Sequence, residues 1–256
     1  MMSASPPVSC MCLTYGRPHL LEEAIESFLR QDYRGTKELI VLNDLPDQQL
    51  RFEHPEVQII NLGKRFRSLS EKRNACAALC SHDWLFVWDD DDIYLPWRIS
   101  YSIEMMDHER QFFKPAQSFM LSDGIITGPH ANVFHSSACW HRRLFDEVQG
   151  YPHVFGTGED IAIESKFKQA LAGRSLSDNI PVEKNFYIYR WGGTGSYHIS
   201  GFGDATDHTM VADYISRQLE SGNIPSGEIL LDPHWKTNYL AKILRYLNQM
   251  TATSSA

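Results

Sequence analysis

The sequence predicts an α/β protein with a mostly parallel central sheet flanked by helices. Three observations support this class. Strand and helix patterns alternate over the first hundred residues, which is the order that builds parallel sheets. The apolar run at residues 84–88 (WLFVW) is typical of a short strand that is covered on both faces. The composition, with 43% hydrophobic and 22% charged residues, is that of an ordinary globular protein.

The elements of the first half follow from apolar spacing and end signals. We expect strands at residues 8–14, 38–42, 57–61 and 84–88. Apolar residues recur at helical intervals from Leu20 to Leu29, which indicates an amphipathic helix. Ser68 and Glu71 have the spacing of a capping box for a second helix. Pro96 favours the first turn of a third helix, which we expect to run to about residue 109.

The second half is less regular. We expect strand-like pieces at residues 118–121, 132–134, 137–140 and 186–191. Helices are expected at 159–171 (with Gly173 as the C-cap), 208–220 and 234–249. Residues 192–203 are glycine-rich, as in a mobile loop, and the tail from residue 251 is expected to be disordered. We expect one domain with a Rossmann-like nucleotide-binding half (8–110), a smaller acceptor half (111–203) and C-terminal helices (204–250).

Charge and cysteine content exclude several classes of protein. The net charge of −8 argues against a general affinity for nucleic acid or anionic membrane. No apolar run approaches the roughly 20 residues that span a bilayer, and the first residues do not resemble a signal peptide. The five cysteines fall at buried-looking positions, which suggests reduced thiols in a cytoplasmic protein. Their spacing lacks paired zinc knuckles.

Four consecutive aspartates, residues 89–92, follow the buried strand at 84–88. Such neighbours repel one another, so folding alone would not select them. A divalent cation bound to a phosphate-bearing ligand removes this repulsion, and hard oxygen ligands suit Mg²⁺ or Mn²⁺. The alternative is a solvated acidic turn that caps the helix beginning near Pro96.

The predicted topology brings three loops together. Right-handed crossovers place the carboxyl ends of parallel strands on one edge of the sheet, where ligands of open α/β sheets bind. On that edge we expect the loop at residues 14–17, the pair Asn43-Asp44, and the four aspartates. This convergence predicts a crevice for a nucleotide-type ligand.

The order of five motifs resembles family 2 (GT-A fold) glycosyltransferases. These are TYGRP, ELIVLND, SEKRN, FVWDDDDIYLP and a downstream GED, and the match covers roughly residues 8–195. The resemblance implies a GT-A-like fold and a metal-dependent transferase. Such an enzyme moves a sugar from a nucleotide-diphosphate donor, expected to be a UDP-sugar, to a hydroxyl acceptor with inversion.

The resemblance also assigns roles to the nucleotide loop and its neighbours. Thr14, Tyr15 and Arg17 match the first nucleotide-contacting loop. The family's usual Asp-Asp pair is Asn43-Asp44 here, so the contact with the base is expected from Asp44. Arg73 matches an arginine that reaches the nucleotide; the alternative is a surface residue of the helix.

The acidic residues take the metal and catalytic roles of the family. Asp89, Asp90 and Asp91 match the DXD signature, with Asp91 as the ligand of Mn²⁺ or Mg²⁺ and Asp89 or Asp90 on ribose or the donor sugar. Glu159 and Asp160 match the (E)D motif. Its Asp is the candidate general base, which a helix N-terminus would keep ionised. The alternative is that Glu159 and Asp160 only cap the helix.

Weaker resemblances concern the sugar and the acceptor. Trp140 lies in a segment (WHRRLF) like the one that lines the acceptor and donor sugar in family members. Trp191 and Tyr197 are candidates for stacking on a sugar ring. His198 is a candidate metal ligand or diphosphate contact, although a lone loop histidine often has neither role.

Other functions and partners stay open at this stage. A nucleotidyltransferase uses a similar sheet, but its first loop usually carries glycines and a lysine that TYGRP lacks. A non-catalytic nucleotide-sugar or glycan-binding protein is the other alternative, and the four Asp together with GED weigh against it. The acceptor is a glycan, protein, lipid or modified nucleobase. The apolar stripes of the C-terminal helices pack against the domain or against a second subunit.

Overall fold

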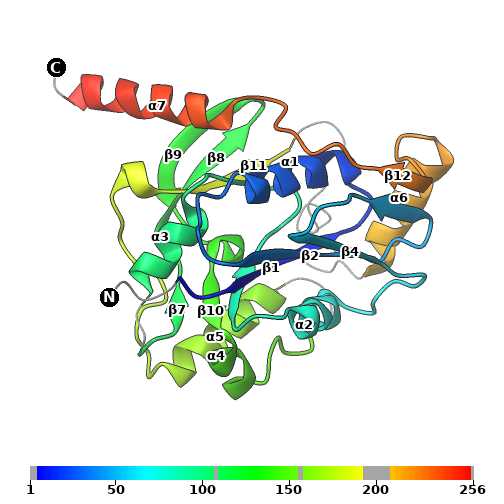
Figure 1. Ribbon diagram of the computed structural model, residues 1–256, viewed down its shortest axis with the longest axis horizontal. Coiled ribbons are helices and arrows are strands. Elements are labelled where there is room, and N and C mark those ends of the chain that lie inside the picture. Colours follow the sequence, from blue (N-terminus) through cyan, green and yellow to red (C-terminus); the bar gives the residue numbers. More distant parts are fainter. Residues whose placement is uncertain (1–4, 107–108, 155–157, 193–207, 255–256) are drawn as a thin grey trace.

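A computed structural model describes residues 5–106, 109–154, 158–192 and 208–254. Its centre is a six-stranded sheet in the order β4-β2-β1-β5-β10-β7 (Figure 1). The first four strands of that order are parallel, and β10 is antiparallel to both of its neighbours. The strands are β1 (Val8–Thr14), β2 (Lys37–Asn43), β4 (Val57–Asn61), β5 (Trp84–Val87), β7 (Phe112–Phe113) and β10 (Cys139–His141). The mostly parallel central sheet is therefore confirmed.

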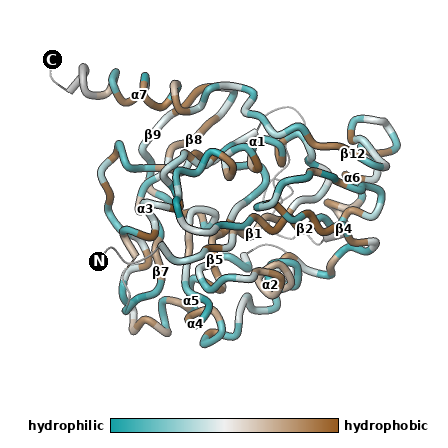
Figure 2. The backbone as a smooth tube through the Cα atoms, in the orientation of Figure 1, coloured by the Kyte–Doolittle hydropathy of each residue, from teal (hydrophilic) through white to brown (hydrophobic). Residues whose placement is uncertain are grey.

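Helices cover both faces of this sheet. Helix α1 (Pro18–Leu29) lies on one face, and α2 (Leu69–Leu79), α4 (Arg142–Glu147) and α5 (Glu159–Ala170) lie on the other (Figure 1). Side chains alternate between the faces of a strand. In β1, Cys10 and Cys12 accordingly join the core beneath α1, whereas Met11 and Leu13 join the core beneath α2. Figure 2 shows the apolar residues concentrated in these central strands.

Two smaller sheets complete the fold. The order β6-β11-β8-β9 is built from β6 (Ile93–Tyr94), β8 (Gln117–Ser122), β9 (Ile125–Ala131) and β11 (Tyr187–Trp191). Strand β3 (Gln48–Arg51) pairs in parallel with β12 (Gly227–Leu230), so a late segment of the chain is hydrogen-bonded to an early one. Between β6 and β7 lies α3 (Arg98–Met105).

The local signals place most elements within a few residues. Ser68 caps α2 by accepting a hydrogen bond from the Glu71 N–H at 3.1 Å, as predicted. Gly173 follows α5 with φ +79°, and its N–H donates to the Lys168 carbonyl. The expected strand at 132–134 is wrong, because the hairpin partner of β8 is β9.

Two helix boundaries also differ from the prediction. The helix expected at 96–109 begins at Arg98 and ends at Met105, and a two-residue strand, β6, precedes Pro96. The helix expected at 234–249 is α7 (Tyr239–Ser254). The residues before it run along α1, where the Trp235 indole donates to the Ser27 hydroxyl. All of 192–203 except Gly192 lies outside the described residues.

Both C-terminal helices pack against the domain. In α6 (His208–Glu220), Val211 and Ile215 are buried with Leu45. In α7, Tyr239 and Ile243 belong to the main core. Across the described ranges no helix is both long and apolar enough to cross a bilayer. All five cysteines are buried and unbridged.

Candidate functional site

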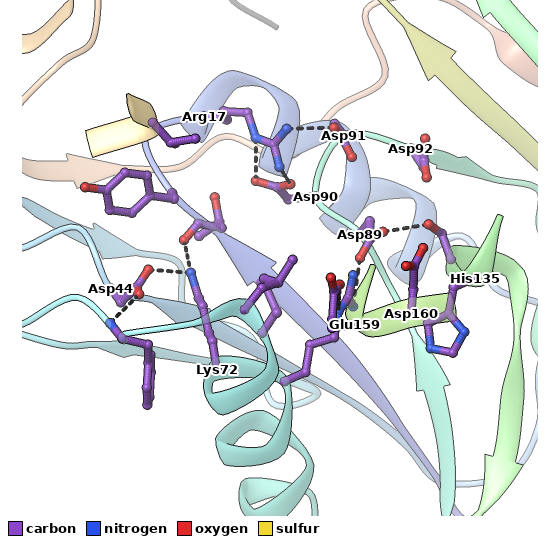
Figure 3. A pocket seen from close by; sticks show the side chains of 18 of the residues that line it. Arg17, Asp44, Lys72, Asp89, Asp90, Asp91, Asp92, His135, Glu159 and Asp160 are labelled. Carbon is purple, nitrogen blue, oxygen red and sulfur yellow. Dashed lines mark hydrogen bonds and ion pairs between the residues drawn. The ribbon is translucent and has the colours of Figure 1, made fainter. Parts of the chain in front are cut away.

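A cavity of about 320 Å³ opens at the carboxyl ends of β1, β2 and β5. It brings together residues that are far apart in the sequence, and Figure 3 shows many of them from close by. The predicted residues that line it are Thr14, Tyr15, Arg17, Asp44, Arg73, Asp89, Asp90, Asp91, Glu159 and Asp160. The predicted convergence of three loops on one edge of the sheet is therefore confirmed.

One end of the cavity is organised by Asp44. Its carboxylate accepts hydrogen bonds from the Lys72 ammonium at 2.5 Å and from the Phe66 N–H at 3.0 Å. Lys72 also donates to the Thr14 carbonyl at 2.7 Å, which ties β1 to α2. The Asn43 amide instead turns inward, donating to the Gln48 carbonyl. Of the Asn43-Asp44 pair, only Asp44 lines the cavity.

Lys72 also lines the cavity, although no sequence pattern singles it out. It stands next to Arg73 in SEKRN and is only 5% exposed. Burial lowers its pKa below the ordinary value, and the neighbouring Asp44 carboxylate opposes that shift. The adjacent motif was the only available signal, because nothing local distinguishes Lys72 from a solvated helix residue.

The loop between β1 and α1 carries Tyr15 and Arg17. The Arg65 guanidinium lies 4.4 Å from the centre of the Tyr15 ring. Gly16 has φ +73°, and a side chain there would meet the Ile215 side chain of α6 at 3.1 Å. A glycine therefore suits both the backbone conformation and the close approach of α6.

Arg17 binds two of the four aspartates. Its guanidinium donates to Asp91 at 2.6 Å and pairs with the Asp90 carboxylate, as the dashed lines in Figure 3 indicate. Asp90 is fully buried. Burial raises the pKa of Asp90 to about 6; the Arg17 charge opposes this shift and Asp91 adds to it. This wall of the cavity thus already accommodates a positive group.

Asp89 belongs to a second cluster. It accepts from the Ser136 hydroxyl at 2.6 Å and from Arg73 at 3.4 Å, and Arg73 also binds Glu159 at 3.0 Å. Burial pushes the pKa of Asp89 upward, but Arg73 and the Ser136 hydroxyl outweigh it, so the pKa lies below the ordinary value. Arg73 is 9% exposed, which contradicts the alternative of a surface helix residue.

Asp92 faces the second sheet. Its carboxylate accepts from the Tyr187 hydroxyl at 2.7 Å and from the Arg190 N–H at 3.0 Å. Burial, followed by the charges of Asp91 and Asp89, raises the pKa of Asp92 well above the ordinary range. Since Asp90, Asp91 and Asp92 are all buried, the alternative of a solvated acidic turn is wrong.

Glu159 and Asp160 start α5 but differ in their surroundings. Glu159 is 4% exposed and bound to Arg73, so it does more than cap the helix. Asp160 is half-buried at the cavity, and its carboxylate accepts the Ile161 N–H at 2.7 Å. Gly158 precedes them with φ +102°, a conformation that glycine adopts readily.

The donor set fits a hard divalent cation whose remaining ligands come from outside the protein. Within the described part of the chain, no group of three or more His, Cys, Asp or Glu side chains is arranged to hold a metal ion. Asp89, Asp90 and Asp91 are nevertheless among the carboxylates that line one cavity, and the Arg17 cation lies between the last two. Mg²⁺ typically binds through one or two carboxylates and substrate phosphates, which matches this arrangement.

The weaker sugar-contact predictions have mixed outcomes. Trp140 is fully buried between Phe112 and Phe167 and does not line the cavity, so its assignment is wrong. The reason is that β10 lies inside the sheet, where both faces are covered. Trp191 ends β11, is 46% exposed and does not line the cavity; its contact stays a prediction. Tyr197 and His198 lie outside the described residues.

Several further residues line the cavity without a sequence signal of their own. Phe134 and Tyr189 stack with ring centres 3.7 Å apart. Val211 reaches the same cavity from α6. These side chains come from three distant segments, and only the folded chain brings them together.

Comparisons with known structures reveal the same fold. The S. aureus TarS fragment 1–349 in complex with UDP-GlcNAc is 13% identical, with a TM-score of 0.58, covering 96% of this chain and 73% of that one. The mannosyltransferase PcManGT from Pyrobaculum calidifontis, in complex with GDP-Man and Mn²⁺, is 13% identical, with a TM-score of 0.52 and coverage of 86% and 73%. At this identity the likeness shows the fold alone.

Other comparisons define the extent of the match. In the TarS 1–349 structure without a named ligand, the aligned part is 72% of this chain and only 60% of that one, with a TM-score of 0.55 and 13% identity. A search of curated proteins found no match. The family model for glycosyl transferase family 2 matches residues 9–146, more than half of the sequence. This chain belongs to glycosyl transferase family 2.

Proposed function

We propose that this protein is a metal-dependent glycosyltransferase that uses a nucleotide-diphosphate sugar. The observation that carries the proposal is the meeting of Asp44, Arg17 and Asp89–Asp91 around one cavity in a family 2 chain. A carboxylate at one end of the cavity and an acidic, arginine-bearing wall at the other suit a nucleoside diphosphate. The nucleotide-sugar complexes of the two structural neighbours support this proposal.

The donor lies with its base at Asp44 and its diphosphate near Arg17. Asp44 accepts the imino N–H of the base, which in the family that the motifs resemble is typically that of uracil. Thr14 and Tyr15 border the base, and Arg73 reaches the nucleotide from α2. A UDP-sugar is accordingly the proposed donor.

Asp91 is the proposed ligand of Mn²⁺ or Mg²⁺, and Asp89 and Asp90 contact ribose or the donor sugar. When bound, the metal neutralises the charge that builds on the departing diphosphate. Arg17, which pairs with Asp90 and Asp91 on this wall of the cavity, is the proposed contact for the same phosphates. Its guanidinium is suited to phosphate oxygens in two-point contacts.

Asp160 is the proposed general base. An acceptor hydroxyl must lose its proton as its oxygen attacks the anomeric carbon, and a carboxylate at the cavity can take that proton. Asp160 lies in the first turn of α5, where the helix dipole favours acidic side chains. Attack opposite the departing diphosphate inverts the configuration of the sugar.

Calorimetric titration of UDP in the presence and absence of Mn²⁺ tests the donor and metal assignment. The expected result is binding that Mn²⁺ strengthens in the wild type and no longer strengthens in Asp91→Asn. Asp178→Asn is the matched control, because Asp178 pairs with Arg110 away from the cavity. Equal UDP binding with and without Mn²⁺ in the wild type would contradict the proposal. Metal-assisted binding without any donor hydrolysis or transfer would instead favour a non-catalytic binding protein.

A further inference from the structure

Arg190 of β11 is hydrogen-bonded to residues 89–92, which we call the acidic loop. Its Nε donates to the backbone carbonyl of Asp91 at 2.7 Å, and its backbone N–H donates to the Asp92 carboxylate at 3.0 Å. Arg190 therefore holds two consecutive residues of the loop, one by its carbonyl and one by its side chain. The Asp91 carboxylate itself is left to the cavity side, where it meets Arg17.

Glu23 of α1 fixes the guanidinium of Arg190. The Arg190 Nη2 donates to Glu23 at 3.1 Å, and Glu23 is fully buried. Its second carboxylate oxygen accepts the Tyr239 hydroxyl at 2.5 Å and the Lys236 N–H at 3.3 Å. A buried carboxylate with this set of donors is a well-satisfied anchor rather than a solvated charge.

The donors to Glu23 other than Arg190 come from the segment at residues 231–239, which we call the C-terminal strap. The strap lies along α1: the Asp232 N–H donates to Glu22 at 2.9 Å, and the Trp235 indole donates to the Ser27 hydroxyl at 2.9 Å. A continuous chain of hydrogen bonds therefore runs from the strap through Glu23 and Arg190 to Asp91.

We propose that Arg190 is a positioning residue that fixes Asp91 for cation binding, and that the C-terminal strap holds Arg190 in place through Glu23. The inference rests on the proposed function. It extends that function by giving the late part of the chain a role at the donor site.

Electrostatics favours a geometric role for Arg190. Arg17 and Arg73 already supply cations to the carboxylates of residues 89–91. Arg190 instead contacts the backbone carbonyl of Asp91 and the carboxylate of Asp92. The charge of Arg190 is balanced by Glu23, so the pair adds little net field at the metal position. Replacing Arg190 by lysine keeps the charge but cannot reproduce the contacts of a planar guanidinium. The expected loss is therefore one of geometry, and groups that orient metal ligands typically contribute about 10- to 100-fold in affinity.

The first experiment compares Arg190→Lys with Arg110→Lys. Arg110 is the matched control: it is a buried arginine that donates to the Phe112 carbonyl and to Asp178, away from the cavity. Both variants are expected to lower the melting temperature. Only Arg190→Lys is expected to weaken Mn²⁺ binding in the presence of UDP by about 10-fold or more, measured by electron paramagnetic resonance of free Mn²⁺.

The second experiment tests the strap. Tyr239→Phe removes the hydroxyl that donates to Glu23, whereas Tyr246→Phe removes one that donates to the Gly128 carbonyl from the same helix. Tyr239→Phe is expected to speed amide hydrogen exchange in residues 89–92 and to weaken Mn²⁺ binding severalfold. Tyr246→Phe is expected to do neither.

These outcomes separate the inference from the proposed function. If Arg190→Lys and Tyr239→Phe bind Mn²⁺ within twofold of their controls and leave exchange in 89–92 unchanged, the positioning role is wrong. If the wild type binds no Mn²⁺ with UDP, the proposed function is wrong. In that case the exchange measurement still shows whether the strap holds the acidic loop.

Discussion

Glu159 and Asp160 are adjacent in the chain but have different side-chain partners. Glu159 is neutralised by Arg73, while Asp160 keeps a carboxylate at the cavity. We predict that Asp160→Asn lowers kcat by about 10²- to 10⁴-fold, the typical contribution of a general base. Donor affinity, measured by titration with UDP and Mn²⁺, is expected to stay unchanged. Normal turnover in this variant would exclude Asp160 as the base.

Lys72 gives a prediction about stability. Lys72→Met leaves the buried Asp44 carboxylate without its cation, which costs about 3 kcal/mol of unfolding free energy. Lys37→Met is the control, since Lys37 is similarly buried but its partner Glu56 is 38% exposed and can be hydrated. Urea denaturation measures both. An equal loss in the two variants would show that the Asp44 pair has no special role.

Glu164 gives a prediction about pH. Burial raises the pKa of Glu164, but hydrogen bonds from His135 and Lys114 outweigh it, and the pKa lies below its ordinary value of 4.5. A carboxyl with a lowered folded pKa contributes stability above its unfolded pKa and loses it as pH falls through the folded value. The stability difference between wild type and Glu164→Gln should therefore be largest above pH 4.5 and shrink below it. A difference that is constant from pH 6 to pH 3 would contradict this assignment.

At the scale of residues, the sequence predicted the cavity residues that lie within a recognisable motif. The sequence predicted in this way that Asp44, Arg73 and the aspartates lie at one crevice, and they line the same cavity. Lys72 and Phe134 were not predicted, because their roles depend on partners that are distant in sequence. The predicted sugar contact of Trp140 is wrong for a related reason, because its motif did not reveal that β10 is covered on both faces.

The loop before α1 permits a test at the scale of elements. Gly16→Ala places a side chain at φ +73° and against Ile215 of α6, which we expect to cost about 1–2 kcal/mol. Gly63→Ala is the control, because a side chain there meets nothing within 4 Å. Thermal unfolding distinguishes them. If Gly16→Ala is as stable as Gly63→Ala, α6 does not pack against this loop in solution.

Regular elements were predictable where the pattern is local. The boundaries of β1, α5 and α6 follow from apolar spacing, glycine and charge. The two-residue strand β6 was not predictable, since its pairing with β11 joins residues about 95 positions apart. Short elements made by pairing carry almost no signal of their own.

At the scale of the whole molecule, the packing of α7 on the core can be tested by its contribution to stability. On α7, Ile243 is fully buried and its neighbour Leu244 is 50% exposed. We predict that Ile243→Ala lowers the unfolding free energy by about 2–4 kcal/mol, while Leu244→Ala changes it by less than about 0.5 kcal/mol. Chemical denaturation measures both. Equal effects would mean that α7 does not occupy this position in solution.

The crevice was predictable at this scale because topology rules place the carboxyl ends of parallel strands together. The path of the chain after residue 204 was not. Its apolar stripes were compatible with packing on the domain or on a second subunit, and the structure has α6 and α7 packed on the domain. Amphipathic spacing defines a buried face but not the surface that covers it.

The pairing of β12 with β3 has a consequence for how the protein is made. Gly227 lies opposite Gln48, so this small sheet cannot form until residues 227–230 have left the ribosome. Contacts between such distant residues slow folding, because a long segment must be ordered before they form. Strand β3 must therefore wait during translation with this edge unpaired, and an unpaired strand edge on a nascent chain is open to chaperones and to aggregation.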